Sequence, residues 1–292
     1  MELFRALAVL AESPGPETEQ LVRTLGIEPA PRPEDYTELF LLQTYPYASV
    51  YLGEEGMLGG EARDRIAGFW RAIGATPPTE PDHLAVMLAL YAELRELERA
   101  EPAPERLAAR VRARQTFLWE HLLSWLPAYL DKVLEIAPPT YRAWARLLQD
   151  SLLGEAREAP YQPDAPRWLV DAPGVPDPDL EDATTVLSGL LSPLRSGMIL
   201  TRADLVRAAE ALGLGLRSGE RRFMLEALMG QDPAATLNWL RHEALAWSSR
   251  HEAREVDLPA LGRVWAGRAR ATAESLSTEA TDGCEISQGK AR

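Results

Sequence analysis

Two short segments of the sequence hold the residues with the clearest chemical potential. The first segment arranges tyrosines around a proline, and the second carries two carboxylates and an imidazole ahead of an apolar stretch. Their candidate binding residues are Tyr45, Pro46, Tyr47, Ser49, Tyr51, Glu80, Pro81, Asp82 and His83. Rigid aromatic side chains bind peptides at a low entropic cost. The two segments together therefore favour a peptide-binding site.

Each segment also has a purely structural interpretation. The tyrosine segment can be a loop that packs on neighbouring helices. In the second segment, Glu80 precedes Pro81 in the arrangement of an acidic cap before proline at the first helical position. The sequence alone leaves both interpretations open.

The remaining polar residues indicate neither a metal site nor an enzyme. The chain has four histidines, His83, His121, His242 and His251. Only His83 belongs to a Glu-x-x-His unit, and di-iron helical bundles need a second copy. The sequence also lacks a Gly-x-Ser-x-Gly elbow, a phosphate-binding loop and a dinucleotide fingerprint. We therefore predict no metal, no cofactor and no catalysis.

The elements that must position these residues are helices almost throughout. Apolar residues recur at helical spacing, as in Leu3, Leu7 and Leu10, and no convincing period-2 run is present. The pattern predicts an all-α protein. Helices are expected over residues 2–12, 16–26, 35–45, 59–74, 81–99, 104–124, 126–136, 139–154, 183–192, 201–213, 218–229, 232–250 and 257–276.

Composition suggests a division of the chain. Residues 157–182 contain six prolines and seven acidic residues with almost no helical period, which is typical of an extended linker. The predicted units are a helical domain over 1–156, the acidic proline-rich linker, and a helical C-terminal module over 183–276. The tail over 277–292 is rich in small polar residues and is expected to be disordered.

The overall charge argues against a general nucleic-acid binder. The formal net charge is −13 for 292 residues, which is consistent with a basic partner or simply with solubility. Residues 201–228 resemble a helix-turn-helix in outline, with Arg217, Arg221 and Arg222 on the second helix. Residues 183–256 contain nine Arg and eight acidic residues, so their net charge is only slightly positive. Such a small positive charge argues against DNA binding, which depends on contacts with phosphates. Packed amphipathic helices explain the same stretch.

Several features predict a cytoplasmic protein. The chain begins without a basic n-region, so no secretory signal is expected. Its longest apolar stretches are interrupted short of the ~20 residues that span a bilayer, so no stable membrane insertion is expected. The single cysteine, Cys284, has no partner for an internal disulfide.

Three motifs in succession resemble the TorD/DmsD/NarJ family. They are the Tyr-Pro-Tyr-x-Ser-x-Tyr segment from Tyr45 to Tyr51, the Glu-Pro-Asp-His-Leu junction from Glu80 to Leu84, and Phe117 to Leu122 with Trp125. The resemblance covers roughly residues 1–156. It implies a TorD-like helical bundle, with the C-terminal module as an extension.

The resemblance implies a cytoplasmic chaperone that matures molybdenum-containing oxidoreductases. Such a chaperone binds the twin-arginine signal peptide of the oxidoreductase catalytic subunit and shields the apoenzyme until its molybdopterin cofactor is inserted. The nine residues named above match the family's motif segments, and His121 and Trp125 would support the groove from behind. A NarJ-like assembly factor for an unexported subunit is the alternative within the family. Whether the chain is a monomer or a domain-swapped homodimer stays open.

Overall fold

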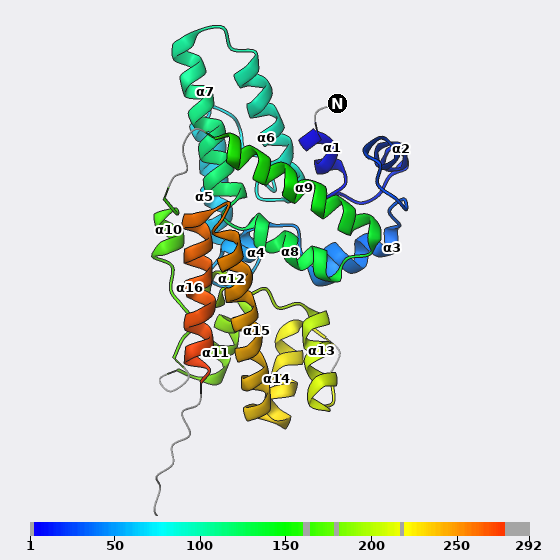
Figure 1. Cartoon of the computed structure of the whole chain (residues 1–292), viewed down its shortest axis with the longest axis vertical. Helices are drawn as coiled ribbons and strands as arrows, with labels where there is room; N and C mark the ends of the chain where they lie inside the picture. Colours follow the sequence, from blue (N-terminus) through cyan, green and yellow to red (C-terminus); the bar gives the residue numbers. More distant parts are fainter. Residues whose placement is uncertain (1–2, 160–163, 178–180, 217–218, 278–292) are drawn as a thin grey trace, which may run out of the picture.

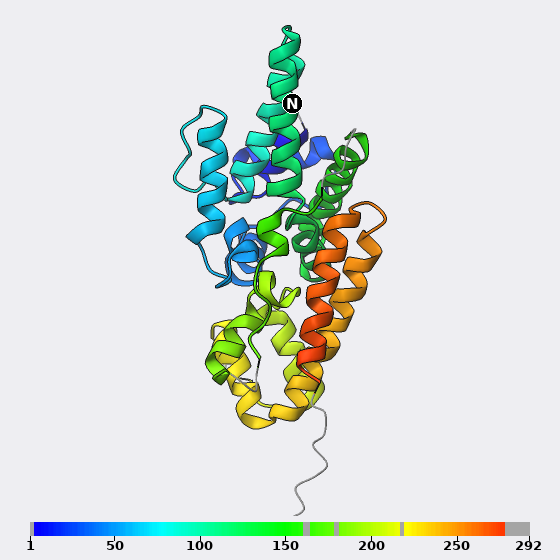
Figure 2. The ribbon, with the colours of Figure 1, turned by 90° about the vertical axis from the view of Figure 1, so that its left-hand side faces the viewer.

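The computed structural model describes residues 3–159, 164–177, 181–216 and 219–277 (Figures 1 and 2). Within these ranges the chain forms helices and no strand, and the only β feature is one isolated bridge. The prediction of an all-α protein is confirmed. Among the described helices, none combines the length and apolar character needed to cross a membrane.

The helices of the first half occupy the upper part of Figure 1. They are α1 (Leu3–Val9), α2 (Pro16–Leu25), α3 (Pro33–Tyr36), the π-helical η1 (Thr37–Gln43), α4 (Ala48–Leu52), α5 (Gly60–Ala72), α6 (Leu84–Arg99), α7 (Pro104–Thr116), the π-helical η2 (Phe117–Leu122), α8 (Leu126–Ile136) and α9 (Pro139–Glu158). Helices α6 and α7 form a projecting hairpin, and α1 packs against α6.

Most helices of the second half lie in the lower part of Figure 1, whereas α10 (Arg167–Val170) lies at the left near the level of α4 and α8. The other helices of this half are α11 (Ala183–Leu191), α12 (Pro193–Ser196), α13 (Arg202–Leu212), α14 (Arg221–Gln231), α15 (Pro233–Arg254) and α16 (Pro259–Ser275). The long helices α15 and α16 lie side by side, as Figure 2 shows.

Local sequence signals determine where several of these helices begin and end. Thr201 and Asp204 form a capping box at the start of α13, and Gly213 ends that helix in a left-handed conformation. Asp232 caps α15 ahead of Pro233, as the sequence predicts. The π-helical turns η1 and η2 were not predicted, because the 3.6-residue spacing of apolar residues in the sequence does not distinguish a single π-helical turn from the α-helix around it.

Buried aromatic residues fill the core of the first half. The ring of Phe40 meets Tyr141 at 5.1 Å and Trp144 at 5.7 Å, both edge to face. The indole Nε1 of Trp144 donates to the Leu7 carbonyl at 3.0 Å, which joins α9 to α1. Buried hydrophobic residues of both halves belong to one continuous cluster.

The described part of the predicted linker, residues 164–177, packs on the helices. Leu169 on α10 is fully buried, and the Arg268 guanidinium donates to the carbonyls of Leu169 and Leu194. The Arg65 guanidinium lies 4.2 Å from the ring centroid of Trp168. The division into two domains at 157–182 stays a prediction. Of the predicted disordered tail, residues 278–292 lie outside the described part.

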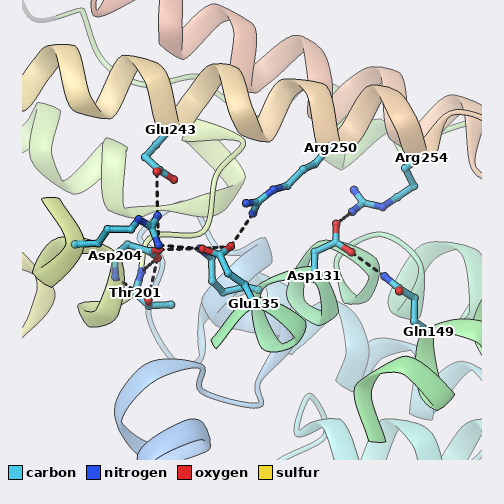
Figure 3. Close-up of polar contacts among 10 residues, drawn as sticks. Asp131, Glu135, Gln149, Thr201, Asp204, Glu243, Arg250 and Arg254 are labelled. Atoms are coloured by element: carbon cyan, nitrogen blue, oxygen red, sulfur yellow. Dashed lines mark hydrogen bonds and ion pairs between the residues drawn. The ribbon is translucent and has the colours of Figure 1, made fainter. Parts of the chain in front are cut away.

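A buried ion network joins α8 to the C-terminal half (Figure 3). The Lys132 Nζ and the Asp204 carboxylate are both fully buried and lie 2.9 Å apart. Lys132 also pairs with Glu135 at 3.1 Å, and Glu135 pairs with Arg250 on α15 at 2.9 Å. Asp131, one turn earlier on α8, pairs with Arg254. Three elements, α8, α13 and α15, are therefore connected by charged contacts.

We expect the substitution Lys132→Met to lower the free energy of unfolding by about 3 kcal/mol, because it removes the buried cation of the Asp204 carboxylate and leaves only Arg207, which is 42 % exposed, to compensate it. The matched control is Arg222→Met, which breaks the exposed Arg222–Glu226 pair and costs less than about 1 kcal/mol. Urea denaturation of both variants measures the difference. Equal losses of unfolding free energy in the two variants would show that the buried Lys132–Asp204 pair stabilises the protein no more than the exposed pair does.

Candidate functional site

The structure brings the two candidate segments into direct contact. Tyr47 and His83 form the isolated antiparallel bridge. The Ala48 amide donates to the Asp82 carbonyl at 3.0 Å, and the Leu84 amide donates to the Pro46 carbonyl at 2.8 Å. Backbone hydrogen bonds therefore hold segments 45–51 and 80–84 together, although more than 30 residues separate Tyr47 from Glu80.

These backbone bonds also move the start of helix α6. The prediction of a helix from Pro81 with Glu80 as its cap is wrong, because α6 begins at Leu84. His83 is its N-cap, and its Nδ1 accepts from the Ala85 amide at 3.2 Å. The bridge to Tyr47 holds His83 in an extended conformation that a helix starting at Pro81 does not allow.

Tyr47, Glu80 and His83 form the accessible part of the site. The Tyr47 hydroxyl donates to Oε2 of Glu80 at 3.0 Å, and its ring meets the His83 ring edge to face at 4.8 Å. Burial and the hydrogen bond to Glu80 raise the pKa of Tyr47 to about 12, so its hydroxyl remains a donor at neutral pH. Burial lowers the pKa of His83, against the effect of nearby carboxylates. The site thus presents an exposed carboxylate beside half-buried rings.

Asp82 lies beneath this surface. Asp82 is only 2 % exposed, and its Oδ2 accepts a hydrogen bond from the Ser49 amide at 3.2 Å. We expected this carboxylate to face a groove, and the structure instead places it between the two segments. Pro81 is buried as well. Asp82 therefore positions the tyrosine segment, and its carboxylate is shielded from solvent.

The other predicted residues stand behind or beside the surface. Tyr51 is 3 % exposed, stacks on Trp125 at 5.2 Å, and donates its hydroxyl to the Tyr45 carbonyl at 3.0 Å. The Ser49 Oγ accepts from the Gly59 amide at 3.1 Å. Tyr45 is half-buried and Pro46 is buried. Trp125 therefore packs against the tyrosine segment, and its role in supporting a binding groove stays a prediction.

His121 belongs to the interior behind α5. It contacts the rings of Phe69 and Phe117 at 5.3 and 5.5 Å, and its backbone carbonyl accepts from Trp125 Nε1 at 2.9 Å. Burial, helped by the Arg65 cation, lowers the pKa of His121 to about 4. Its imidazole is therefore neutral at physiological pH.

Glu12 and Tyr36 are neighbours of the site that the sequence analysis missed. Burial raises the pKa of Tyr36, and the Glu12 carboxylate raises it further. The same carboxylate opposes the lowered pKa of His83, so Glu12 acts on both rings through its charge. Glu12 follows the end of α1, and no local motif marks it. Only the packing of α1 on α6 could have revealed it.

The helix-turn-helix alternative loses its basic surface in the structure. The Arg221 guanidinium donates a hydrogen bond to the Leu200 carbonyl at 2.7 Å, and Arg222 pairs with Glu226 at 2.9 Å. Arg217 lies outside the described residues. On α14, Leu225 is buried against the neighbouring helices, whereas Phe223 is 51 % exposed. Nothing in α13 and α14 favours contact with phosphates.

The described residues also contain no group of three or more His, Cys, Asp or Glu side chains that could hold a metal ion. His83 and His121 in particular lie in different surroundings, one at the surface bridge and one among aromatic rings. The site consists of hydrogen-bonding and aromatic groups.

Comparison with known proteins agrees with this arrangement. Residues 30–131 match the family model described as nitrate reductase delta subunit, a range that contains both segments of the site. The chaperone protein TorD of Vibrio cholerae serotype O1 (strain M66-2) is 33% identical over 122 residues, which cover 39% of this chain and 55% of that protein. TorD of Vibrio vulnificus (strain YJ016) is 33% identical over 113 residues, covering 35% and 51%. TorD of Actinobacillus pleuropneumoniae serotype 3 (strain JL03) is 30% identical over 126 residues, covering 41% and 57%.

The chain spans about half the length of the curated relatives it matches. The matched part of this chain is helical, and the relatives it is similar to are chaperone proteins. This part of the chain is thus similar to the nitrate reductase delta subunit model and to TorD chaperones, the family that its motifs resemble.

The burial of His121 predicts a loss of stability in mild acid. The unfolded chain binds a proton at this imidazole near pH 6.5, whereas the folded chain does so only near pH 4. The free energy of unfolding therefore falls as the pH drops through this window, by up to roughly 1.4 kcal/mol per pH unit. The variant His121→Phe removes the titrating group and should lose less stability over the same range.

Urea denaturation at several pH values measures this slope. The control is His242→Gln, because His242 is exposed. His251, whose pKa burial lowers to about 3, titrates alike in all variants, so only differences between variants count. A His121→Phe slope equal to that of the parent chain would contradict the assignment.

The placement of Asp82 predicts a structural role for its carboxylate. Asp82→Ala leaves the buried Ser49 amide without a partner and should cost about 1–3 kcal/mol of stability. Asp82→Asn retains an acceptor oxygen and should cost distinctly less. Thermal and urea melts of the two variants test this order. An Asp82→Ala variant as stable as the parent chain would show that the hydrogen bond to Ser49 contributes nothing.

Proposed function

We propose that the protein is a cytoplasmic maturation chaperone that binds the signal peptide and the apo form of the catalytic subunit of a molybdopterin-containing oxidoreductase. In this proposal it holds that subunit until its cofactor is inserted before export. The observation that carries the proposal is the surface formed by Tyr47, Glu80 and His83, where two family motif segments meet.

The chemistry of this surface suits a peptide with a basic pair and an apolar stretch. Glu80 is exposed and already accepts one hydrogen bond from Tyr47, which orients its carboxylate. A carboxylate retains further lone pairs for an arginine fork, and such charge-assisted bonds are stronger than neutral ones. Glu12 adds a second exposed carboxylate near His83.

The apolar part of such a peptide has rings to pack against. Tyr45 and Tyr47 are half-buried, so each leaves part of its surface to a ligand. Two exposed leucines, Leu41 (46 %) and Leu42 (36 %), lie on η1 directly before this segment. Rigid rings and adjacent apolar side chains lower the entropic cost of binding an extended segment.

A second candidate function is an assembly factor for a reductase subunit that is not exported. The description of the matching family model, nitrate reductase delta subunit, favours it. Such a factor would recognise an amphipathic N-terminal segment of its partner without a required arginine pair. The two functions therefore differ in how strongly binding depends on arginine.

We expect Glu80→Gln to weaken binding of a leader peptide about five- to tenfold, which corresponds to about 1–1.4 kcal/mol. The probe is a synthetic peptide with two consecutive arginines followed by leucine and alanine residues, and calorimetric titration measures its affinity. The control Glu17→Gln removes an exposed carboxylate on α2 and should leave the affinity unchanged.

A second peptide with glutamine in place of both arginines separates the two candidate functions. Under the leader-binding proposal it binds weakly to the parent chain, and Glu80→Gln makes no further difference. Equal affinity for both peptides would favour the assembly-factor function. Binding that is insensitive to Glu80→Gln for both peptides would remove Glu80 from the site.

A further inference from the structure

A hollow of about 520 Å³ lies between the loop over residues 53–60, helix α10 and helix α12. The loop directly follows α4, the helix that begins inside the tyrosine segment. Trp168 of the linker and Leu194 of α12 form the opposite wall. The hollow is therefore built by both halves of the chain, and the second half lies outside the range that the family model matches.

The loop over 53–60 is held at both ends. Ser192 Oγ donates to the Gly53 carbonyl at 3.2 Å, and Arg195 Nε donates to the Glu54 carbonyl at 3.0 Å. At its other end, the Gly59 amide donates to Ser49 Oγ at 3.1 Å. Gly56 adopts a φ of +63°, and a Cβ there would lie 3.1 Å from the Ser192 Cα. Glycine thus permits the close approach of the loop to the C-terminal half.

This anchored loop presents two large apolar side chains. Met57 is 65 % exposed and Leu58 is 59 % exposed, and both line the hollow. Folding does not account for them, because they gain little burial from the chain itself. Methionine is also a flexible and polarisable side chain that adapts to varied apolar ligands. The pair is suited to contact with another molecule.

Four carboxylates and two arginines line the hollow, so its lining has a net negative charge. The carboxylates are contributed by Glu54, Glu55, Glu61 and Asp171. The two cations of the lining are already engaged: Arg195 pairs with Glu54 at 3.2 Å, and Arg65 lies over the Trp168 ring while it donates to the Leu52 carbonyl. The surface therefore attracts cations and repels acidic ligands.

We propose that this hollow is a second peptide-binding surface, which takes an apolar segment carrying arginine or lysine from the client protein. The proposal rests on the chaperone function proposed above, and charge complementarity together with Met57 and Leu58 identifies the occupant. Ser49 links the two surfaces, since its amide bonds to Asp82 and its Oγ bonds to Gly59. A client can then contact the Tyr47 surface and the hollow at once, which raises its overall affinity without new contacts at either.

Amide hydrogen exchange on the full chain locates the bound peptide. The probe is the synthetic peptide with two arginines followed by leucine and alanine residues, at concentrations that saturate binding. We expect protection of amides in 53–60 as well as in 45–51. The double variant Met57→Ser/Leu58→Ser should lose the protection over 53–60 and bind the peptide about fivefold more weakly. The matched control Leu107→Ser changes an exposed leucine on α7 and should behave as the parent chain.

The charge requirement is tested separately. Glu55→Gln/Glu61→Gln should weaken protection over 53–60, and Glu80→Gln should weaken protection over 45–51 while leaving 53–60 protected. Protection confined to 45–51 would overturn the second surface and leave the proposed function intact. Absence of protection in both segments would overturn both. Protection over 53–60 that appears without peptide as the protein concentration rises would overturn the peptide occupant in favour of a second copy of the chain.

Discussion

The ammonium of Lys132 is fully buried on α8, and its nearest carboxylate, Asp204, is fully buried on α13. Each buried charge has one further partner, Glu135 for Lys132 and Arg207 for Asp204. Separating the pair would still leave both charges less well compensated, so the pair favours contact between the two helices. Weaker contacts follow the same seam. Gln43 on η1 accepts from the Ala203 amide at 3.1 Å, and Trp265 on α16 donates to the Ser124 carbonyl at 2.9 Å. The C-terminal module is thus a fixed part of the structure and not a loosely tethered addition.

The same constraint reaches the candidate site through α8. Trp125 precedes the first residue of that helix and stacks on Tyr51, which in turn supports the tyrosine segment. On the far side of α4, Ser192 and Arg195 hold the loop over 53–60. The short helix α4 is therefore fixed from behind and from its end by elements that belong to different parts of the chain. A rigid support of this kind would reduce the further ordering that the proposed binding of a flexible peptide to the half-buried rings requires.

The sequence was informative where physical signals are local. Helical periodicity predicted the longer helices, whereas the short helices α4, α10 and α12 were not predicted. Residue types selected the two segments that meet at the Tyr47–His83 bridge. Burial of Asp82, proximity of Glu12 and pairing of Lys132 with Asp204 were not predictable, because each depends on contacts between distant elements. The start of α6 was misplaced for the same reason. A proline beside an acidic residue indicates a cap, but bonds from the tyrosine segment decide the conformation of residues 81–83.

The two carboxylates of the Glu80–His83 junction illustrate how one short motif can serve two physical purposes. Asp82 is buried and accepts from the Ser49 amide, so its charge stabilises the contact between the segments and is shielded from solvent. Glu80 is exposed and bonded to the Tyr47 hydroxyl, so its charge is oriented but still accessible. A cation approaching from solvent meets Glu80 first. The buried carboxylate determines where the exposed one points, because Asp82 holds in place the backbone that carries Tyr47, the hydrogen-bond donor to Glu80.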